Sequence, residues 1–336
     1  MIQLGIIGAG RIGRVHVQSL RMIDGVQVKS LADPVLSEET AVWAKEQGVA
    51  QVTKDYQEIL ADPAINAVLI CSSTDTHAPI SLEALAAGKH VFCEKPIDHD
   101  LGRIHAVMEA VKRTGLCYQV GFNRRFDHNF RAVRRAVEAG EIGTPHLIKI
   151  TSRDPEPPSQ AYIRISGGLF MDMMIHDFDM VRYLAGCNAE ELYANAAVLV
   201  DPAIGEAGDV DTAIVTLKME NGSLAVIDNS RRAVYGYDQR CEIFGSEGMA
   251  ATGNDTPSTL HLSTARGICG EKPLWFFLER YTQAYAAELR SFVSAITAHG
   301  LVEVTADDGL QSVRMAMAAK CSLLEHRPVR LDEIPE

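Results

Sequence analysis

The sequence has no excess of basic residues, no long apolar run and no closely paired cysteines. Its 32 Lys and Arg face 44 Asp and Glu, which gives a net charge of −12. Nucleic acids and anionic membranes are bound by basic surfaces, and no stretch approaches the ~18 to 20 uncharged apolar residues of a membrane span. We therefore expect neither a nucleic-acid nor a membrane partner. A phosphorylated cofactor remains possible, because backbone amides at a helix N-terminus can hold phosphate.

The seven cysteines are odd in number and scattered, and none forms a CxxC pair. Disulfide frameworks and zinc clusters show paired spacings, so we expect reduced thiols and no metal. The first ten residues, MIQLGIIGAG, carry no basic segment and only a short apolar run. A secretory signal has both a basic segment and a longer apolar region. We therefore expect a cytoplasmic protein.

Length and pattern predict two domains, because 336 residues at about 150 per domain give roughly two. Strand-like and helix-like segments alternate over residues 1–121, which predicts right-handed βαβ units and a parallel sheet. We expect an α/β chain whose first domain, 1–121, holds a doubly wound parallel sheet. The predicted strands are 3–7, 26–32, 65–71, 90–93 and 116–121. The first predicted helix follows the glycine turn and ends near residue 21, and the other predicted helices are 38–47, 77–87 and 101–114.

After residue 121 the order changes to runs of strands followed by long helices. This order predicts an α+β domain over 122–336 with a large, mostly antiparallel open sheet. The turn Glu220-Asn221-Gly222 indicates a hairpin. The predicted strands are 145–152, 194–200, 211–219, 223–229 and 239–244, and the predicted helices are 127–139, 172–184, 279–299 and 306–326.

The segment Gly8-Ala9-Gly10-Arg11-Ile12-Gly13 matches the G-x-G-x-x-G pattern of a dinucleotide-binding turn. It follows a strand and opens a helix, and Asp33 lies 20 residues beyond it at the end of the next strand. We expect Gly8, Gly10, Arg11, Ile12 and Gly13 to hold a pyrophosphate, as in a Rossmann domain. The Asp33 carboxylate would accept from a ribose 2′-hydroxyl and repel a 2′-phosphate, which favours NAD over NADP. The alternative is a purely structural glycine turn.

The next loop at the same edge, 71–77, also leaves a strand and enters a helix. We expect Ser72, Ser73 and His77 to contact the cofactor, since such loops line the ligand crevice. The alternative, capping of the helix by Thr76, is compatible with that role.

Two further segments carry candidate chemistry. Lys95, in Glu94-Lys95-Pro96, follows a strand and could donate to a substrate oxygen; otherwise it is a solvated lysine. Asp172 and His176 are four residues apart, so on one helix they would share a face. A carboxylate beside an imidazole suits a general base, and the alternatives are a structural ion pair or half of a metal site.

Residues near the domain boundary and in a later strand offer further polar groups. Asn123 and Arg124 precede Arg125, and this pair of arginines could alternatively stabilise the junction by salt bridges. Tyr235 and Tyr237 would point to the same side of an extended strand. Strand tyrosines are more often core or interface residues than ligand contacts.

These motifs together resemble the glucose–fructose oxidoreductase/inositol dehydrogenase/rhizopine catabolism family. The resemblance covers about residues 2–331 and rests on Gly8–Gly13, Glu94-Lys95-Pro96, Gly121–Arg125 and Asp172-x-x-x-His176, in that order. Within the family, four further segments look most like inositol 2-dehydrogenases: Ser152–Pro155, Gly168–Asp172, Ile175–Asp179 and Ser230–Arg240.

The resemblance implies NAD-dependent oxidation of myo-inositol to scyllo-inosose without a metal. His176 would take the hydroxyl proton while hydride leaves for the nicotinamide, Lys95 would donate to the same oxygen, and Asp172 would orient both. The family further implies a homotetramer built by the open sheet. The implied cofactor contacts include Glu94, and the implied substrate contacts are Lys95, Asn123, Arg124, Asp154, Asp172, His176 and Tyr235.

Two rival functions stay open. An enzyme of the same family could act on another cyclic polyol or on an aldose, such as scyllo- or chiro-inositol, glucose or xylose, because stereochemistry depends on small displacements of hydroxyl partners. A non-catalytic NAD-binding regulator could share the fold. The presence of Lys95, Asp172 and His176 speaks against the regulator.

Overall fold

The computed structural model describes residues 1–335, which form two compact units. The first unit consists of Met1–Phe126 and Thr282–Gln311, and the second of Asp127–Tyr281 and the residues from Ser312 onward. The sequence pattern divides the chain after residue 121, whereas the first unit runs to Phe126 and also takes in a segment from near the C-terminus. No described helix is both long enough and apolar enough to cross a membrane.

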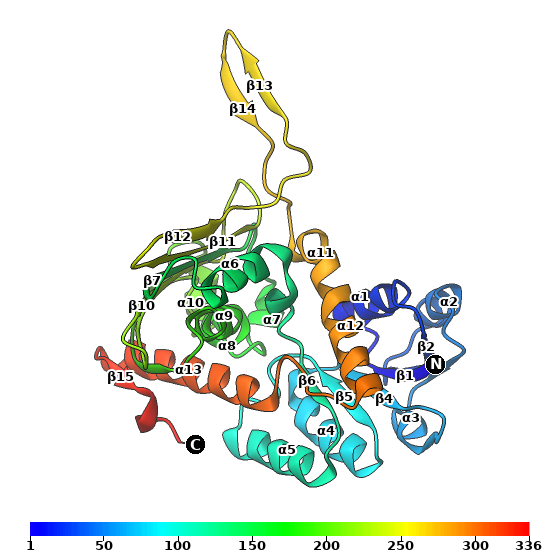
Figure 1. The fold of residues 1–336 in the computed structure, drawn as a ribbon. Coiled ribbons are helices and arrows are strands. Elements are labelled where there is room, and N and C mark those ends of the chain that lie inside the picture. Colours follow the sequence, from blue (N-terminus) through cyan, green and yellow to red (C-terminus); the bar gives the residue numbers. More distant parts are fainter. Residues whose placement is uncertain (336) are drawn as a thin grey trace. The chain divides into compact units, whose positions relative to one another are not determined.

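The first unit is built on a six-stranded parallel sheet with the order β3-β2-β1-β4-β5-β6 (Figure 1). This order is that of a doubly wound Rossmann sheet. All six strands run parallel, and successive strands are added on one side of β1 up to β3 and on its other side from β4 onward. The strands are β1 (Ile2–Ile7), β2 (Val26–Ala32), β3 (Gln51–Thr53), β4 (Ala67–Ile70), β5 (His90–Cys93) and β6 (Tyr118–Val120). The connecting helices are α1 (Arg11–Leu20), α2 (Glu38–Glu46), α3 (Gln57–Ala61), η1 (Thr74–Thr76), α4 (His77–Ala86) and α5 (Leu101–Thr114), and η2 (Asn123–Phe126) follows β6.

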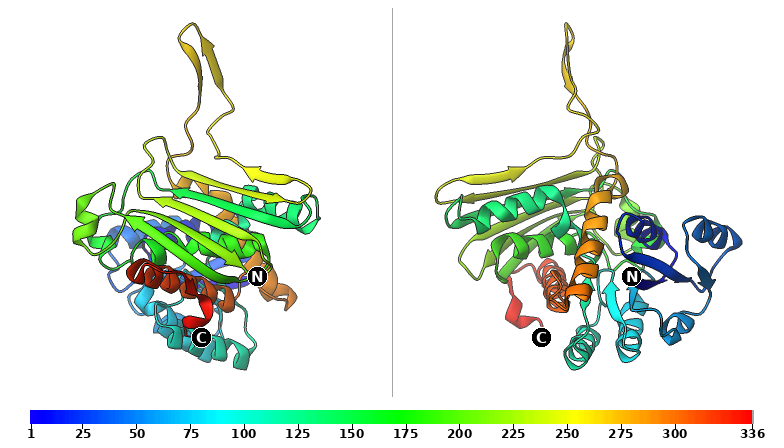
Figure 2. Two further views of the ribbon diagram at one scale, coloured as in Figure 1. Left: turned by 90° about the vertical axis from the view of Figure 1, so that its left-hand side faces the viewer. Right: turned by 45° about the vertical axis from the view of Figure 1, so that its right-hand side comes forward.

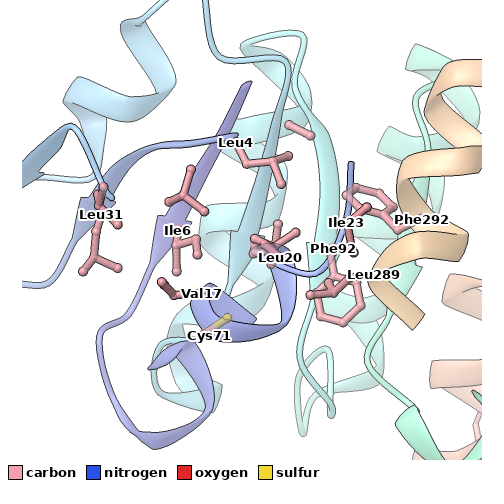
Figure 3. Packing of buried hydrophobic residues seen from close by; sticks show 14 of the residues in the cluster. Leu4, Ile6, Val17, Leu20, Ile23, Leu31, Cys71, Phe92, Leu289 and Phe292 are labelled. Atoms are coloured by element: carbon pink, nitrogen blue, oxygen red, sulfur yellow. The ribbon is translucent and has the colours of Figure 1, made fainter. Parts of the chain in front are cut away.

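A helix from the C-terminal region completes the core of this unit. Leu289 and Phe292 of α12 (Thr282–Ala298) are fully buried in one cluster with Leu20 of α1 and Phe92 of β5 (Figure 3). The rings of Phe92 and Phe292 pack edge to face with centroids 5.9 Å apart. Burial of side chains of this size contributes about 1.5–3 kcal/mol each, which explains why α12 belongs to the first unit. The sequence places the same helix in the second domain.

The second unit contains a seven-stranded mixed sheet with the order β12-β11-β7-β10-β9-β8-β15. Only β7 and β10 pair in parallel; the other neighbours are antiparallel, as the mostly antiparallel prediction requires. The strands are β7 (Pro145–Arg153), β8 (Ala189–Ala197), β9 (Thr212–Met219), β10 (Leu224–Ser230), β11 (Asp238–Gly245), β12 (Met249–Thr252) and β15 (Val329–Arg330).

Helices cover one face of this sheet (Figure 2). Along β9, Ala213, Val215 and Leu217 are buried, whereas Ile214 between them is half exposed, so one face is packed and the other is open. The helices are α6 (His128–Glu138), α7 (Gln160–Ile163), α8 (Leu169–Asp172), α9 (Ile175–Ala185), α10 (Pro202–Glu206) and α11 (Phe277–Arg280). Helix α13 (Ala306–Glu325) begins in the first unit and continues into the second, and η3 (Leu331–Glu333) follows β15.

A hairpin that the sequence pattern does not predict projects from the second unit. Strands β13 (His261–Thr264) and β14 (Gly267–Gly270) pair only with each other, and all their residues are exposed (Figure 1). Leu262 and Ile268 lie in these strands, but polar residues and glycines surround them, so the apolar periodicity that marks a buried strand is absent.

Candidate functional site

Three loops meet at one edge of the parallel sheet of the first unit. Strands β1, β4 and β5 are neighbours in register, with Ile7 beside Ile70 and Ile70 beside Cys93. The segments that follow these strands therefore lie side by side. They are the glycine turn, the loop at Ser72 and the Glu94-Lys95-Pro96 segment, which are the cofactor and lysine motifs predicted from the sequence.

The three glycines of the turn have different surroundings. Gly8 has a φ of +105°, and a Cβ there would lie 2.5 Å from the carbonyl of Cys71. A Cβ on Gly13 would collide with the carbonyl oxygen of Gly8, but one on Gly10 would meet no atom within 4 Å. Gly8 and Gly13 are therefore required by the protein itself, whereas the backbone at Gly10 faces open space. This is the arrangement by which a pyrophosphate approaches the N-terminus of α1.

The Asp33 side chain is hydrogen-bonded to this turn. Its Oδ2 accepts a hydrogen bond from the backbone N–H of Ala9 (2.8 Å), and its Oδ1 accepts one from Val35 (2.9 Å). The carboxylate at the end of β2 is thereby held against the glycine turn, where each oxygen retains a lone pair for a ribose hydroxyl. The turn, the helix N-terminus and this acid fit NAD. Arg11 and Ile12 open α1, so all predicted members of the motif lie in one segment.

Alanine substitutions separate the two kinds of glycine. Gly10 has a φ of −67°, so Gly10→Ala is expected to leave the free energy of unfolding unchanged or raise it by about 0.4–1 kcal/mol. The same change is expected to weaken NADH binding roughly tenfold or more, because the methyl group occupies the approach of the pyrophosphate. Gly13→Ala is expected to lower the free energy of unfolding by about 1–3 kcal/mol. Urea unfolding and a fluorescence titration with NADH measure both; equal stability of the two variants would contradict the assignment.

His77 links two of the three loops from inside the protein. The ring is buried, with Nδ1 2.8 Å from the carbonyl oxygen of Pro96 and Nε2 3.1 Å from that of Ser72. Carbonyl oxygens only accept, so both ring nitrogens donate and the ring is an imidazolium. Burial lowers the pKa of His77, but Cys93 and the two carbonyls outweigh it and raise the pKa to about 9. We predicted His77 as a cofactor contact; in the structure its nitrogens hold the loops.

This histidine predicts a pH dependence of stability. The folded pKa of about 9 exceeds the unfolded value of about 6.5, so the charged ring stabilises the fold fully below pH ~6.5. The contribution, on the order of 3 kcal/mol, is lost as the pH rises to about 9. We expect the difference in unfolding free energy between wild type and His77→Gln to shrink over this range in urea titrations. The exposed His146→Gln is the control, and a pH-independent difference would refute the imidazolium.

The remaining residues of the 71–77 loop are held locally. The hydroxyls of Ser72 and Thr76 are 2.6 Å apart, and Thr76 donates to the carbonyl of Ser73. Thr76 stands at the N-cap of α4, but its side chain makes no capping hydrogen bond, so the capping alternative is wrong. The cofactor role of Ser72 and Ser73 stays a prediction.

Lys95 lies between two anchored residues. On one side, Glu94 Oε1 is 2.7 Å from Nε2 of the buried His16, and Glu94 Oε2 accepts from the backbone N–H of Lys95 (3.3 Å). On the other side, His77 donates to Pro96. The backbone on both sides of the lysine is therefore fixed from the protein interior, which is how a reacting group is held in place.

In the second unit, Asp172 belongs to a network of charged groups. Its Oδ1 accepts from the hydroxyl of Tyr162 (2.9 Å) and its Oδ2 from Nη2 of Arg231 (3.0 Å). Arg231 Nη1 also lies 3.4 Å from Oδ2 of Asp154. The arginine side chain is only 4% exposed. Burial lowers its pKa, but Asp172 and Asp154 outweigh this effect, so the pKa is raised overall. Arg231 thus bridges two of the predicted site carboxylates.

The parallel pairing of β7 and β10 explains this bridge. Arg153 and Ser230 are register partners at the ends of the two strands, so the next residues, Asp154 and Arg231, emerge together from the same edge. The backbone N–H of Asp154 also donates to the carbonyl of Ser230 (3.0 Å). An antiparallel pair would have sent these residues to opposite ends of the sheet.

The single helix predicted over 172–184 is two helices. Asp172 ends α8, and His176 is the second residue of α9, with Met173 and Met174 in a turn between them. The pair therefore lies across a break between two helices, and the shared face expected from the i, i+4 spacing stays a prediction.

Tyr235 lies in a loop before β11. Gly236 has a φ of +130°, so the segment is not extended: Tyr237 is buried, whereas Tyr235 is 39% exposed. The two tyrosines would share a side only in an extended strand, and this condition is not met. The Tyr235 hydroxyl donates to Asp238 (2.6 Å) and accepts from Arg153 (3.3 Å).

Asn123 and Arg124 lie in η2 and are buried, and their proposed substrate contacts stay predictions. Three residues of these networks are not among those predicted from the sequence: Arg231, Tyr162 and His16. A sequence signal for Arg231 existed, because it lies in the segment that resembles inositol dehydrogenases. Its role, however, depends on a strand pairing that the sequence did not predict. His16 is spaced along α1 so that it falls on the buried face of the helix, and this is the only sequence signal for it.

Comparison with known proteins agrees with this geometry. A family model described as an oxidoreductase family with an NAD-binding Rossmann fold matches residues 2–122, and one described as a GFO/IDH/MocA C-terminal domain matches residues 130–251. The chain is 50% identical to the uncharacterized oxidoreductase YrbE of Bacillus subtilis, over 98% of this chain and 97% of that protein. It is 46% identical to a myo-inositol 2-dehydrogenase of Thermotoga maritima, over 99% of both chains.

Solved structures show the same fold. A probable dehydrogenase from Thermotoga maritima superposes with a TM-score of 0.97 at 46% identity, covering 99% of this chain and 100% of that one. A scyllo-inositol dehydrogenase from Lactobacillus casei, solved with NAD(H) and scyllo-inositol, has a TM-score of 0.92 at 30% identity and covers 99% of both chains. This chain therefore belongs to the GFO/IDH/MocA family of oxidoreductases, and its first unit is an NAD-binding Rossmann domain.

Proposed function

We propose that this protein oxidises myo-inositol to scyllo-inosose with NAD⁺ as the hydride acceptor. The observation that carries the proposal is Lys95, which is anchored through Glu94 and Pro96 beside the glycine turn. The similarity to a myo-inositol 2-dehydrogenase over 99% of the chain supports the substrate. Residues 1–121 would bind the cofactor, and residues 122–336 would bind the substrate and form the oligomer.

Each proposed catalytic residue has a separate task. His176 accepts the proton of the hydroxyl group while hydride passes from the same carbon to bound NAD⁺, so a ketone forms. Lys95 donates a hydrogen bond to the substrate oxygen and stabilises its negative charge as the proton leaves. Asp172 is held by Tyr162 and Arg231 and provides a fixed carboxylate that orients the cationic groups. Asn123, Arg124, Asp154 and Tyr235 bind the other ring hydroxyls.

The test is NADH absorbance in a matched panel of myo-, scyllo- and chiro-inositol, glucose and xylose. A clear preference in kcat/KM for myo-inositol with NAD⁺ is the expected result. Turnover of another member alone would assign that compound as the substrate instead. Comparable efficiency with NADP⁺ would contradict the role of Asp33. NAD binding without turnover of any member would favour the regulator.

A second candidate substrate is scyllo-inositol. The solved scyllo-inositol dehydrogenase of Lactobacillus casei shares this fold over nearly the whole chain. The two substrates differ in the orientation of one hydroxyl, which a shift in a few hydrogen-bonding side chains can accommodate. Identity is higher with the myo-inositol enzyme, so myo-inositol remains the first choice.

We also propose a cytoplasmic homotetramer that associates through the open face of the seven-stranded sheet. Leu147 is the register partner of both Leu224 and Phe244, and each of these side chains is 43–51% exposed, so an apolar row crosses three strands. Phe244→Asp is expected to lower the mass measured by light scattering from tetramer to a smaller species. Glu242→Asp on the same strand is the control, and an unchanged mass for Phe244→Asp would refute this interface.

A further inference from the structure

Three ionisable side chains are buried together at the Glu94-Lys95-Pro96 segment of the first unit. They belong to His16 of α1, Glu94 after β5 and Glu288 of α12, and each of these residues as a whole is at most 8% exposed. One ligand-type atom from each residue lies within 4.8 Å of those from the other two. His16 and Glu94 are directly bonded at 2.7 Å, whereas neither carboxylate oxygen of Glu288 has a hydrogen-bond donor among the described residues.

No lysine or arginine ion pair to Glu288 or to Glu94 is found among residues 1–335. The ring of His16 packs edge-on against Phe92 and Tyr285, with centroids 5.2 and 5.7 Å away. Even a positively charged His16 would balance only Glu94, and an ionised Glu288 would then be a buried, unpaired charge. Such a group takes up a proton instead.

Burial and the negative charge of Glu94 act in the same direction, and together they raise the pKa of Glu288 well above its usual range. A protonated carboxyl is a donor, and the carboxylate of Glu94 is a nearby acceptor. The space around Glu94 is also limited, since a Cβ on Gly121 would lie 3.1 Å from its carboxylate. Glu94 therefore has one direct partner in His16 and a second potential partner in Glu288.

A divalent cation is the other occupant that such a set of groups could hold. Ligand atoms around a tetrahedral zinc ion lie about 3.3 Å apart, since each bond is about 2.0–2.1 Å. The His16–Glu94 contact of 2.7 Å is a hydrogen bond and leaves no room for an ion between the two atoms. The observed geometry thus favours a proton over a metal.

We propose that Glu288 is a positioning residue for Lys95: a buried carboxylic acid that donates a hydrogen bond to the Glu94 carboxylate and so, with His16, fixes the Glu94-Lys95-Pro96 segment. The link to the lysine is direct, because the backbone N–H of Lys95 is hydrogen-bonded to the same carboxylate. The consequence for turnover rests on the proposed catalytic role of Lys95. The protonation state of Glu288 does not depend on that catalytic role.

The first experiment measures the proton without using activity. The infrared spectrum of the wild-type protein at neutral pH is expected to contain the C=O stretch of a buried protonated carboxyl, which E288Q abolishes. E109Q, at an exposed position on α5, is the control and should retain the band. A spectrum without a band that is specific to Glu288 would overturn the proposal, as would one equivalent of divalent metal found by elemental analysis of the purified protein.

The second experiment asks whether the donated hydrogen bond matters for turnover. Glutamine keeps the neutral charge and a donor, so E288Q is expected to retain kcat and the Kd for NADH within about threefold. Leucine removes the donor, so E288L is expected to lower kcat about tenfold or more, with a Kd for NADH within about threefold of wild type. Equal impairment of both variants would overturn the positioning role. If E288L does not fold, E288Q decides: retained kcat supports the proposal and a tenfold loss refutes it.

The two proposals can fail separately. If every polyol in the panel is inert, the function proposed above fails, but the infrared band still tests whether Glu288 is a carboxylic acid. If the polyol is oxidised and Lys95→Met abolishes turnover while the band is absent, only the proposal on Glu288 fails.

Discussion

Replacing Lys95 with methionine is expected to reduce kcat for polyol oxidation by about 10²–10³, the usual cost of removing one donor to a developing oxyanion. Methionine preserves the length and apolar stem of the side chain and removes the charge. The anchors of the loop, His16 to Glu94 and His77 to Pro96, do not involve the Lys95 ammonium group. The Kd for NADH and the urea midpoint should therefore remain close to those of the wild type.

Steady-state kinetics, NADH titration and urea unfolding together test this prediction. Lys112→Met, at an exposed position on α5 of the same unit, is the matched control and should leave all three measurements unchanged. Retention of turnover by Lys95→Met would refute the catalytic assignment. Loss of NADH binding would instead make the lysine a cofactor residue, and the proposed mechanism would then need a different donor.

Arg231→Met is expected to lower the free energy of unfolding by about 3–5 kcal/mol, because it removes a buried cation that two carboxylates share. Asp172 and Asp154 both lose a partner. The hydrogen bond from the Tyr162 hydroxyl to Asp172 would remain. We expect kcat to fall as well, since the carboxylate loses its fixed orientation.

The next residue in the chain offers the control. Arg232 is exposed, so Arg232→Met should change the unfolding free energy by no more than about 0.5 kcal/mol. Urea unfolding of both variants, with kinetics on the folded fraction, gives the comparison. Equal stability of the two variants would show that the cluster does not depend on Arg231, and a stable Arg231→Met with unchanged kcat would remove Arg231 from the site.

The cofactor half of the protein could be predicted from the sequence because its signals are local. Gly8, Gly10 and Gly13 occur at a fixed spacing, and Asp33 follows at the end of the next strand. Glycine is required there by a positive φ at Gly8 and by close backbone packing at Gly13, so few other sequences produce that turn. The alternation of strands and helices then orders the sheet, because parallel strands need right-handed crossovers.

The remainder was decided by contacts between segments far apart in the chain. Helix α12 reads as an ordinary amphipathic helix, and only the burial of Leu289 and Phe292 against α1 and β5 assigns it to the first unit. Glu288 comes with it to His16, which is 272 positions earlier by the numbering. No local pattern relates residues so distant, since hydrophobic periodicity reports a face and not its partner.

The sequence by itself determined the Rossmann domain and the cofactor turn, because alternating strands and helices and a glycine motif with its own backbone requirement are local signals. Tertiary structure alone decided that β7 and β10 run parallel, which brings Arg231 to Asp154 and Asp172. It also decided that Asp172 and His176 lie on separate helices. Strand direction and helix breaks follow from which surfaces can be buried together, and that is settled only when the whole chain packs.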